Sequence, residues 1–244
     1  MGFNFYFLSD YKFQKKLKKF SFQPPLALIN PLLDFDFIQI LGSDATVNDT
    51  ICIYGVKNHV RKAILWNPAT YKVKVIPPSI GELLPPEAIS DCQIYGFGYD
   101  HARDDYKLIQ HVDVAESGES FWEIYSLKTN SWRKLDFDMP AHREIYDRND
   151  VYFNGVCHWL DIAYDDDNFV IVVVSFHLSN EMCIVTPFPS LEDMNFTFNN
   201  IYLNVLNGSV ALMINLGSSL HISVLGELGV KESWVRLVDT GPLT

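Results

Sequence analysis

One hairpin-like pattern recurs four times along the chain and restricts its fold more than any other feature. In the first three copies a polar turn separates two strand-like runs, and two apolar residues lie seven positions apart across that turn. These pairs are Trp66 and Val73, Tyr125 and Trp132, and Phe176 and Cys183, and Trp234 takes the second position in the fourth copy. The second positions recur at intervals of about 50–60 residues, and such a period in short strands is typical of a β-propeller.

A second repeat lies in the turns between strands. Asn154-Gly155 and Asn207-Gly208 each separate two apolar runs. This dipeptide favours a type I′ turn, because both of its residues take positive φ. Asn48-Asp49 stands at the corresponding place in the first copy, and the longer segment Asp100–Asp104 stands there in the second. The two repeats are in phase, so they predict a similar hairpin arrangement four times.

Together the repeats predict an all-β fold, an incomplete kelch-like β-propeller of about four four-stranded blades. The expected strands are Phe35–Leu41, Thr50–Tyr54, Lys62–Trp66, Lys72–Ile76, Gln93–Tyr99, Asp105–Val112, Phe121–Ser126, Ser131–Asp136, Val151–Phe153, Val156–Leu160, Val170–Phe176, Met182–Thr186, Ile201–Leu206, Ser209–Asn215, Leu220–Leu225 and Ser233–Val238. A short helical or irregular segment is expected over Met1–Phe20, followed by a proline-containing linker. The expected division is residues 1–34 as N-terminal segment and linker, and residues 35–244 as the propeller-like domain.

Charge and cysteine spacing limit the possible partners. The chain has 19 Lys and Arg against 30 Asp and Glu, a net charge of −11 that disfavours nucleic acid and favours a basic protein or peptide. Cys52, Cys92, Cys157 and Cys183 show no CxxC spacing, so buried free thiols in a reducing compartment are expected rather than a zinc site. No apolar run approaches the roughly 20 residues of a membrane span, and the N-terminus lacks a signal-peptide pattern. The expected compartment is the cytoplasm or nucleus.

No motif predicts catalysis, so no catalytic, cofactor-binding or metal-binding residue is assigned and no enzyme is expected. His158 and His177 lie at repeat positions, where packing or a turn hydrogen bond explains them. Gly96-Phe97-Gly98 lacks the third glycine and the helix of a phosphate-binding loop, so close backbone packing or a bulge is expected there. The five tryptophans are expected to make core or inter-blade contacts. A glycan-acting propeller enzyme, which needs paired carboxylates around a pocket, is kept as a minor alternative.

A series of longer motifs covers the chain from about Phe35 to Leu243. They read, in order, LWNPATYKVKVIPPS, YGFGYDHARDDYKLIQHV, WEIYSLKTNSWRKLDFDMP, VYFNGVCHWL, VVSFHLSNEMCIVTPFP and LGELGVKESWVRL. This series resembles the kelch-like F-box-associated domain of plant F-box/kelch-repeat and S-locus F-box-like proteins. The resemblance implies a propeller that selects the protein to be ubiquitinated, joined to an F-box that binds the Skp-type adaptor of a cullin-containing ubiquitin ligase.

The chain departs from this family pattern at three places. The F-box core is absent and only Phe7–Leu17 is similar to the segment that follows it, so residues 1–34 are expected to be a remnant after a missing F-box. The family's glycine-containing entry to the first hairpin is replaced by Gly42–Asp49. The chain stops at Gly241–Thr244, where relatives continue for at least another blade. A chain truncated at both ends is expected to form an open arc, whose unpaired strand edges favour self-association.

Two functions stay open from the sequence. The first is a protein–protein interaction domain that recognises substrates for a plant SCF-type ubiquitin ligase. Its partners would be a protein of unknown identity, the Skp-type adaptor and a cullin, without nucleic acid, membrane or cofactor. The alternative is an adaptor-free binding module, a decoy or a non-functional fragment of such a receptor. Binding residues are expected on loops of varying length: Pro77–Asp91, Asp113–Ser120, Pro140–Asp150 and Asp161–Asn168.

Overall fold

In the computed structural model, strands make up most of the described chain. The described residues are 3–9, 16–22, 37–41, 46–57, 60–115, 117–141, 150–165, 168–189, 200–217 and 219–240. They form four four-stranded antiparallel sheets and one separate two-stranded sheet. The predicted all-β, four-bladed propeller is therefore confirmed.

Each four-stranded sheet is one blade, and its strands are hydrogen-bonded in sequence order. Blade 1 contains β3 (Phe37–Leu41), β4 (Ile51–Lys57), β5 (Val60–Asn67) and β6 (Lys72–Val75). Blade 2 contains β7 (Ile89–Asp100), β8 (Asp105–Val114), β9 (Ser120–Ser126) and β10 (Ser131–Lys134). Blade 3 contains β11 (Asp150–Phe153), β12 (Val156–Asp165), β13 (Asn168–His177) and β14 (Cys183–Pro187). Blade 4 contains β15 (Ile201–Leu206), β16 (Ser209–Asn215), β17 (Leu220–Leu225) and β18 (Trp234–Thr240).

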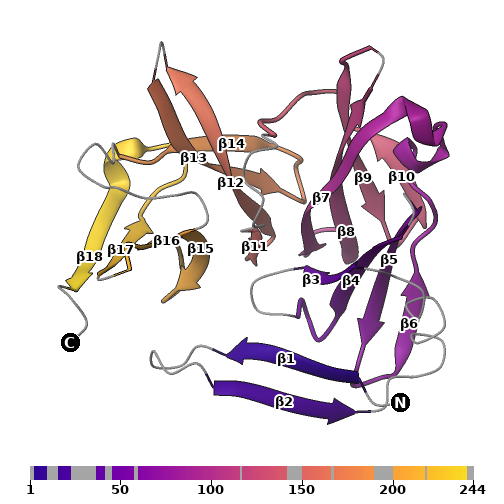
Figure 1. Ribbon diagram of the computed structural model, residues 1–244, viewed down its shortest axis with the longest axis horizontal. Helices are drawn as coiled ribbons and strands as arrows, with labels where there is room; N and C mark the ends of the chain where they lie inside the picture. The colour runs from indigo at the N-terminus through magenta and orange to yellow at the C-terminus, as the bar shows by residue number, and fades with distance from the viewer. Residues whose placement is uncertain are drawn as a thin grey trace.

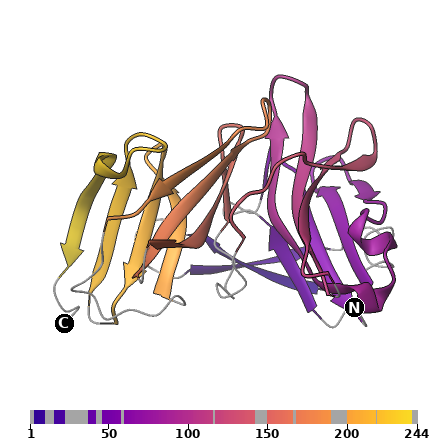
Figure 2. The same cartoon turned by 90° about the horizontal axis from the view of Figure 1, so that it is seen from above.

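The blades follow one another around a common centre (Figures 1 and 2). The first strands of the blades lie toward that centre, where β7 contacts β11 and β11 contacts β15, while β6, β10, β14 and β18 lie outside. Short 3-10 turns, η1 (Gly81–Leu83) and η2 (Pro86–Ala88), connect blade 1 to blade 2. Another, η4 (Lys231–Ser233), precedes β18.

Apolar side chains fill the spaces between successive blades. Leu65 and Phe97 belong to the cluster between blades 1 and 2, and Leu212 to the cluster between blades 3 and 4. Between blades 2 and 3, the ring centroids of Trp122 and Trp159 lie 5.5 Å apart. Because each fully buried large apolar side chain contributes roughly 1.5–3 kcal/mol, these clusters are the main force that holds the blades together.

The seven-residue pairs of the sequence lie directly opposite each other across the last hairpin of their blades. Val73 is the cross-strand partner of Trp66, Trp132 of Tyr125, and Cys183 of Phe176. Trp234 pairs with Leu225 in blade 4. The spacing arises because the preceding turn has a similar form in the first three blades, with Tyr71, Asn130 and Glu181 at positive φ two residues before the second position.

Two tryptophans of this repeat also tie their blade to the one before it. The indole Nε1 of Trp132 donates a hydrogen bond to the carbonyl oxygen of Pro77 at 2.9 Å, just after the last strand of blade 1. Trp234 Nε1 donates in the same way to Pro187 at the end of blade 3, at 3.1 Å. The repeat therefore encodes inter-blade contacts as well as strand pairing.

The first hairpin of three blades closes with the left-handed turn that the sequence predicts. Asn154 and Gly155 have φ of 48° and 83°, and Asn207 and Gly208 have φ of 50° and 81°. Asn48 and Asp49 take the same conformation without glycine, with φ of 45° and 60°. An aspartate tolerates this region at some cost in free energy, so blade 1 keeps the turn although the glycine is missing.

The Gly96-Phe97-Gly98 segment forms a close contact between blades. The register of β7 and β8 shifts between Ile94 and Gly96, as a bulge does. A Cβ atom on Gly98 would lie 2.4 Å from a ring carbon of Tyr152 in blade 3, and one on Gly96 would lie 2.8 Å from the Cβ of Cys157. The two glycines are therefore required by packing.

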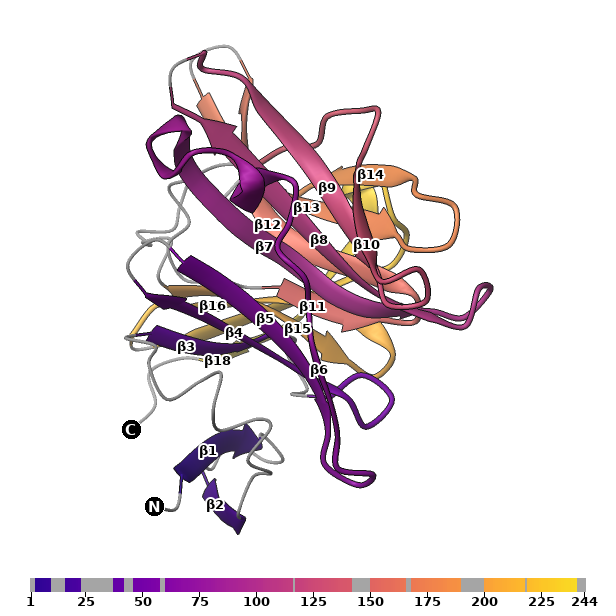
Figure 3. The same cartoon turned by 90° about the vertical axis from the view of Figure 1, so that its right-hand side faces the viewer.

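The prediction of a helical or irregular segment over Met1–Phe20 is wrong for the residues of that range that the structure describes. Phe3–Ser9 forms β1 and Lys16–Phe22 forms β2, and the two strands pair with Phe3 opposite Phe22 and Phe5 opposite Phe20. Alternating aromatic residues favour strands, and here that periodicity of two prevails over the lysine-rich composition. The hairpin lies outside the four blades, at the bottom of Figures 1 and 3.

Candidate functional site

The candidate site lies at the end of the blades where the first strand turns into the second and the third into the fourth, called here the turn end. Within each antiparallel blade, the turn between its first two strands and the turn between its last two lie at the same end of the sheet. Three segments of the turn end border a groove between blades 1 and 2, with a volume of about 480 Å³. The groove is lined by Asn48, Tyr99, Asp104, Asp105, Tyr106, Leu127 and Lys128.

Two tyrosine rings form the aromatic wall of the groove. Tyr99 and Tyr106 meet edge to face, with ring centroids 4.9 Å apart. The hydroxyl of Tyr106 donates to the carbonyl oxygen of Asn48 at 3.1 Å and accepts from the hydroxyl of Thr50 at 3.0 Å. Tyr106 thus bridges blade 2 to the turn of blade 1, and these contacts hold the wall in place before any partner arrives.

Two carboxylates stand beside the tyrosine wall. The Tyr99 hydroxyl donates to exposed Asp104, and this hydrogen bond raises the pKa of Tyr99 to about 12. Asp105 is buried and accepts from the Ser126 hydroxyl at 2.6 Å and the Lys128 backbone N–H at 2.8 Å. The groove therefore offers aromatic faces next to negative charge, an arrangement that suits a cationic side chain.

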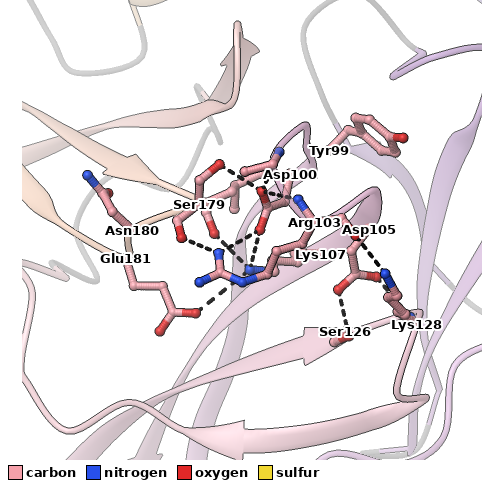
Figure 4. Close-up of polar contacts among 12 residues, drawn as sticks. Tyr99, Asp100, Arg103, Asp105, Lys107, Ser126, Lys128, Ser179, Asn180 and Glu181 are labelled. Atoms are coloured by element: carbon pink, nitrogen blue, oxygen red, sulfur yellow. Dashed lines mark hydrogen bonds and ion pairs between the residues drawn. The ribbon is translucent and has the colours of Figure 1, made fainter.

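A buried ionic network supports the turn end between blades 2 and 3. Figure 4 shows Arg103, Lys107 and Ser179 converging on Asp100. Lys107 Nζ donates to Asp100 at 2.8 Å and to the Leu178 carbonyl at 2.7 Å, and Ser179 Oγ donates to Asp100 at 2.7 Å. Two backbone N–H groups of the following turn also donate to Asp100. The side chains of Asp100 and Lys107 are 0% and 5% exposed, so this is a desolvated pair whose charges depend on each other.

These contacts fix the charge of Asp100. Burial by itself raises the pKa of a carboxyl, but the hydrogen bonds from Lys107, Ser179 and Arg103 outweigh it and hold the pKa of Asp100 well below its usual range. Asp100 is consequently ionised in the folded chain. It positions the turn that carries Asp104 and Asp105 into the groove.

A second buried carboxylate anchors the long connection at the opposite end of the blades. Glu123 has 0% exposure and accepts from the Ile80 backbone N–H at 2.9 Å and from the Gln110 amide at 2.8 Å. Burial raises the pKa of Glu123, and this effect exceeds the opposite effect of the hydrogen bonds, which lower the pKa. Its hydrogen bonds to the backbone of Ile80 and Gly81 hold η1 in place.

The described residues contain no group of three or more His, Cys, Asp or Glu side chains placed to hold a metal ion. Within the same part of the chain, no helix is long and apolar enough to cross a membrane.

Comparison with known proteins identifies the fold. The family model of the F-box associated beta propeller domain matches residues 7–221. The chain belongs to this family. F-box protein CPR1 of Arabidopsis thaliana is 25% identical, over 76% of this chain and 49% of its own length. An F-box/kelch-repeat protein of the same plant is also 25% identical, over 87% of this chain and 56% of its own.

The chain thus spans about half the length of the curated relatives it matches. Among solved structures, TolB from Acinetobacter baumannii superposes with a TM-score of 0.47 and 11% identity, over 92% of this chain and 46% of TolB.

The loops that the sequence predicts to bind a partner are only partly described in this F-box associated propeller. Pro77–Asp91 is held by Glu123 and contains η1 and η2. Residue 116 of the second loop, 142–149 of the third and 166–167 of the fourth lie outside the described residues. That these loops bind a partner stays a prediction.

Sequence reasoning missed the residues that shape the groove and its support in this family member. It assigned Asp104 to a turn, which is where this residue lies. It had no signal for the pairing of Asp100 with Ser179, which is 79 residues away in the sequence. One feature of the sequence could have drawn attention to this turn: five charged residues lie within eight positions, namely Asp100, Arg103, Asp104, Asp105 and Lys107.

Proposed function

We propose that this chain is a protein-binding domain that selects substrates for a plant SCF-type ubiquitin ligase. The match to the F-box associated propeller family carries this proposal. The similar proteins are F-box proteins, and a wide surface of turns and loops on a rigid propeller suits recognition. Residues 35–244 act as the recognition domain, in the cytoplasm or nucleus, and the chain itself catalyses no reaction.

The groove between blades 1 and 2 is the proposed contact for the substrate. Its supporting features are tyrosine faces, adjacent carboxylates and turns held by buried hydrogen bonds. With a net charge of −11 on the chain, the matching partner is a basic segment of a protein. Tyrosine is enriched at the energetic centres of protein interfaces, because it buries a large rigid surface and keeps a polar tip.

The test of the ligase role is adaptor binding. The 244-residue chain is mixed with a plant Skp-type adaptor, and a full-length F-box relative serves as the positive control. Retention of the adaptor supports a working receptor. Loss of retention while the control binds would overturn coupling to the ligase, and would leave the adaptor-free binding module or decoy.

The groove is tested separately by reversing one exposed charge. Asp104→Arg places a cation in the groove, and Asp136→Arg makes the same change at an exposed position outside the groove, just after the last strand of blade 2. The wild-type chain and both variants are used to retain proteins from a plant extract. A partner of the groove should be retained by the wild type and by Asp136→Arg, and should be at least ten-fold depleted with Asp104→Arg. Equal retention by all three chains would exclude this groove as the contact.

A further inference from the structure

A second cavity lies between blades 3 and 4, on the side of blade 3 away from the Asp100 network. Its volume is about 290 Å³. The turn residues Asn154, Gly208 and Gly226 line it and are exposed, whereas Val210 and Leu225 line it and are buried. The cavity therefore opens at the turn end, and part of its wall is apolar.

Two imidazoles lie at different depths in this cavity. His177 is paired with Val156 next to the turn of blade 3, and His158 lies two residues further along β12, opposite Ser175. Two residues of a strand correspond to roughly 6–7 Å, so His158 lies one pleat deeper than His177. Its exposure of 2% against the half-buried His177 agrees with that order.

The deeper imidazole keeps one ring nitrogen available to a ligand. His158 Nδ1 is hydrogen-bonded to Ser175 Oγ at 2.8 Å. No described residue hydrogen-bonds its Nε2. A polar atom in a cavity wall is satisfied by water or by a ligand group, and an apolar ligand that displaced the water would leave it unpaired at a cost in free energy.

The charge state of His158 further restricts the kinds of ligand that the cavity can bind. Burial, with a smaller effect from nearby His177, lowers the pKa of His158 to about 3. The ring is therefore neutral at physiological pH. A neutral imidazole offers an anionic ligand no opposite charge to offset its loss of hydration in the cavity, so a neutral hydrogen-bonding group is favoured.

We propose that this cavity binds the side chain of a tyrosine supplied by a partner protein, with the ring packed against Val210 and Leu225 and the hydroxyl at His158 Nε2. The cavity is at the lower limit of the roughly 300–1,000 Å³ of small-molecule sites, a size for one ring rather than a larger ligand. The bond to Ser175 is compatible with either tautomer of His158. A phenol hydroxyl both donates and accepts, so it suits both tautomers, whereas an indole N–H only donates.

The first test uses p-cresol, the side-chain analogue of tyrosine. Two related compounds serve as comparisons: toluene, which lacks the hydroxyl, and 4-methylbenzoate, which carries a carboxylate in its place. Binding to the full chain is followed by NMR, including the ring nitrogen resonances of His158. We expect p-cresol to bind and to shift Nε2 of His158, toluene to bind at least ten-fold more weakly without that shift, and 4-methylbenzoate not to bind at pH 7. Equal binding of toluene and p-cresol, or no binding of p-cresol, would overturn the proposal.

Two variants locate the binding. Ser209→Trp adds a large side chain to a half-buried residue that lines the cavity, and Ser131→Trp makes the same change at the first residue of β10 in blade 2. The Ser209→Trp chain should lose p-cresol binding by at least ten-fold while its amide spectrum stays dispersed. Ser131→Trp should bind as the wild type does. Unchanged binding by Ser209→Trp would place the ligand elsewhere and overturn the assignment.

That a partner protein supplies the tyrosine ring rests on the proposed function. This source is tested by comparing the affinity of the chain for N-acetyltyrosinamide with its affinity for N-acetylphenylalaninamide. Binding of the tyrosine derivative, at least ten-fold tighter than the phenylalanine derivative, supports a protein side chain. Binding of p-cresol without N-acetyltyrosinamide would overturn that source in favour of a free small phenol. Neither result depends on adaptor retention, so failure here and failure of the ligase role are distinguishable.

Discussion

The charge on Asp100 shows how much one residue contributes when it is buried. Five groups donate hydrogen bonds to its carboxylate, from its own turn, from β8 and from blade 3. Lys107, which is also buried, depends on the same carboxylate for compensation. Because an unpaired charge in this environment is far more costly than a missing surface contact, the network specifies how blades 2 and 3 meet.

Asp100→Asn should therefore destabilise the chain strongly. Removing one partner of a buried ion pair costs about 3–5 kcal/mol, so the free energy of unfolding in urea should fall by about that amount. Asp136→Asn, which changes an exposed acid just after the last strand of blade 2, should change the free energy of unfolding by less than about 0.5 kcal/mol. Similar effects of the two substitutions would show that the network does not stabilise the fold.

The wild type and Asp100→Asn should also differ in how their stability depends on pH. The pKa of Asp100 in the folded chain is lowered, so its contribution is complete above the unfolded value of about 3.9 and is lost as the pH falls through the folded value. The gap in unfolding free energy between wild type and Asp100→Asn should thus be largest above about pH 5 and should narrow toward pH 2. A gap independent of pH would assign the effect to packing rather than to charge.

At the scale of the strands, the inter-blade indole bonds connect the sequence repeat to the tertiary structure. Trp132 belongs to the outer strand of blade 2, and its Nε1 reaches Pro77 after the outer strand of blade 1. Tyr125, its cross-strand partner, instead hydrogen-bonds Asn130 within the same hairpin at 3.0 Å. One position of the repeat thus joins blades, and its neighbour stabilises a turn.

Trp132→Phe and Tyr125→Phe separate these two roles. Each removes one hydrogen bond and keeps an aromatic ring, so each should cost about 0.5–1.5 kcal/mol, with a further packing loss for the smaller ring at Trp132. Hydrogen exchange should show faster opening at the boundary of blades 1 and 2 in Trp132→Phe. In Tyr125→Phe the change should be confined to the β9–β10 hairpin. Identical exchange patterns in the two variants would contradict the inter-blade role.

At the scale of the whole molecule, the reactivity of the thiols measures whether the blades open. All four cysteines are free in the structure, and Cys52, Cys92 and Cys157 are buried. Burial raises the pKa of all four thiols, and for half-buried Cys183 it raises the pKa to about 11. The thiolate is the reactive form, so burial suppresses reaction both by excluding the reagent and by keeping the proton on sulfur.

The native chain should therefore react slowly with a thiol-specific disulfide reagent at pH 8. Cys183 should be modified first, and the other three should react only as fast as the blades unfold. In denaturing urea all four should react at once. Rapid reaction of more than one thiol in the native chain would show that the propeller opens locally without global unfolding.

The sequence by itself determined the blades. The strands, the left-handed turns and the cross-strand pairs such as Trp66 with Val73 follow from residue preferences within a few positions, and those preferences recur along the chain. The N-terminal hairpin shows the limit of this reasoning, since lysines in Phe7–Leu17 obscured an aromatic alternation that favours strands.

Only the tertiary structure decided where the sites lie. The groove, the Asp100 network and the cavity at His158 each join residues of two blades, more than 50 positions apart in the sequence. Whether a carboxylate or an imidazole in a strand faces solvent, a partner or a cavity depends on the neighbouring blade. That blade also sets burial and thereby charge, because desolvation and hydrogen bonding act through space and local sequence does not record them.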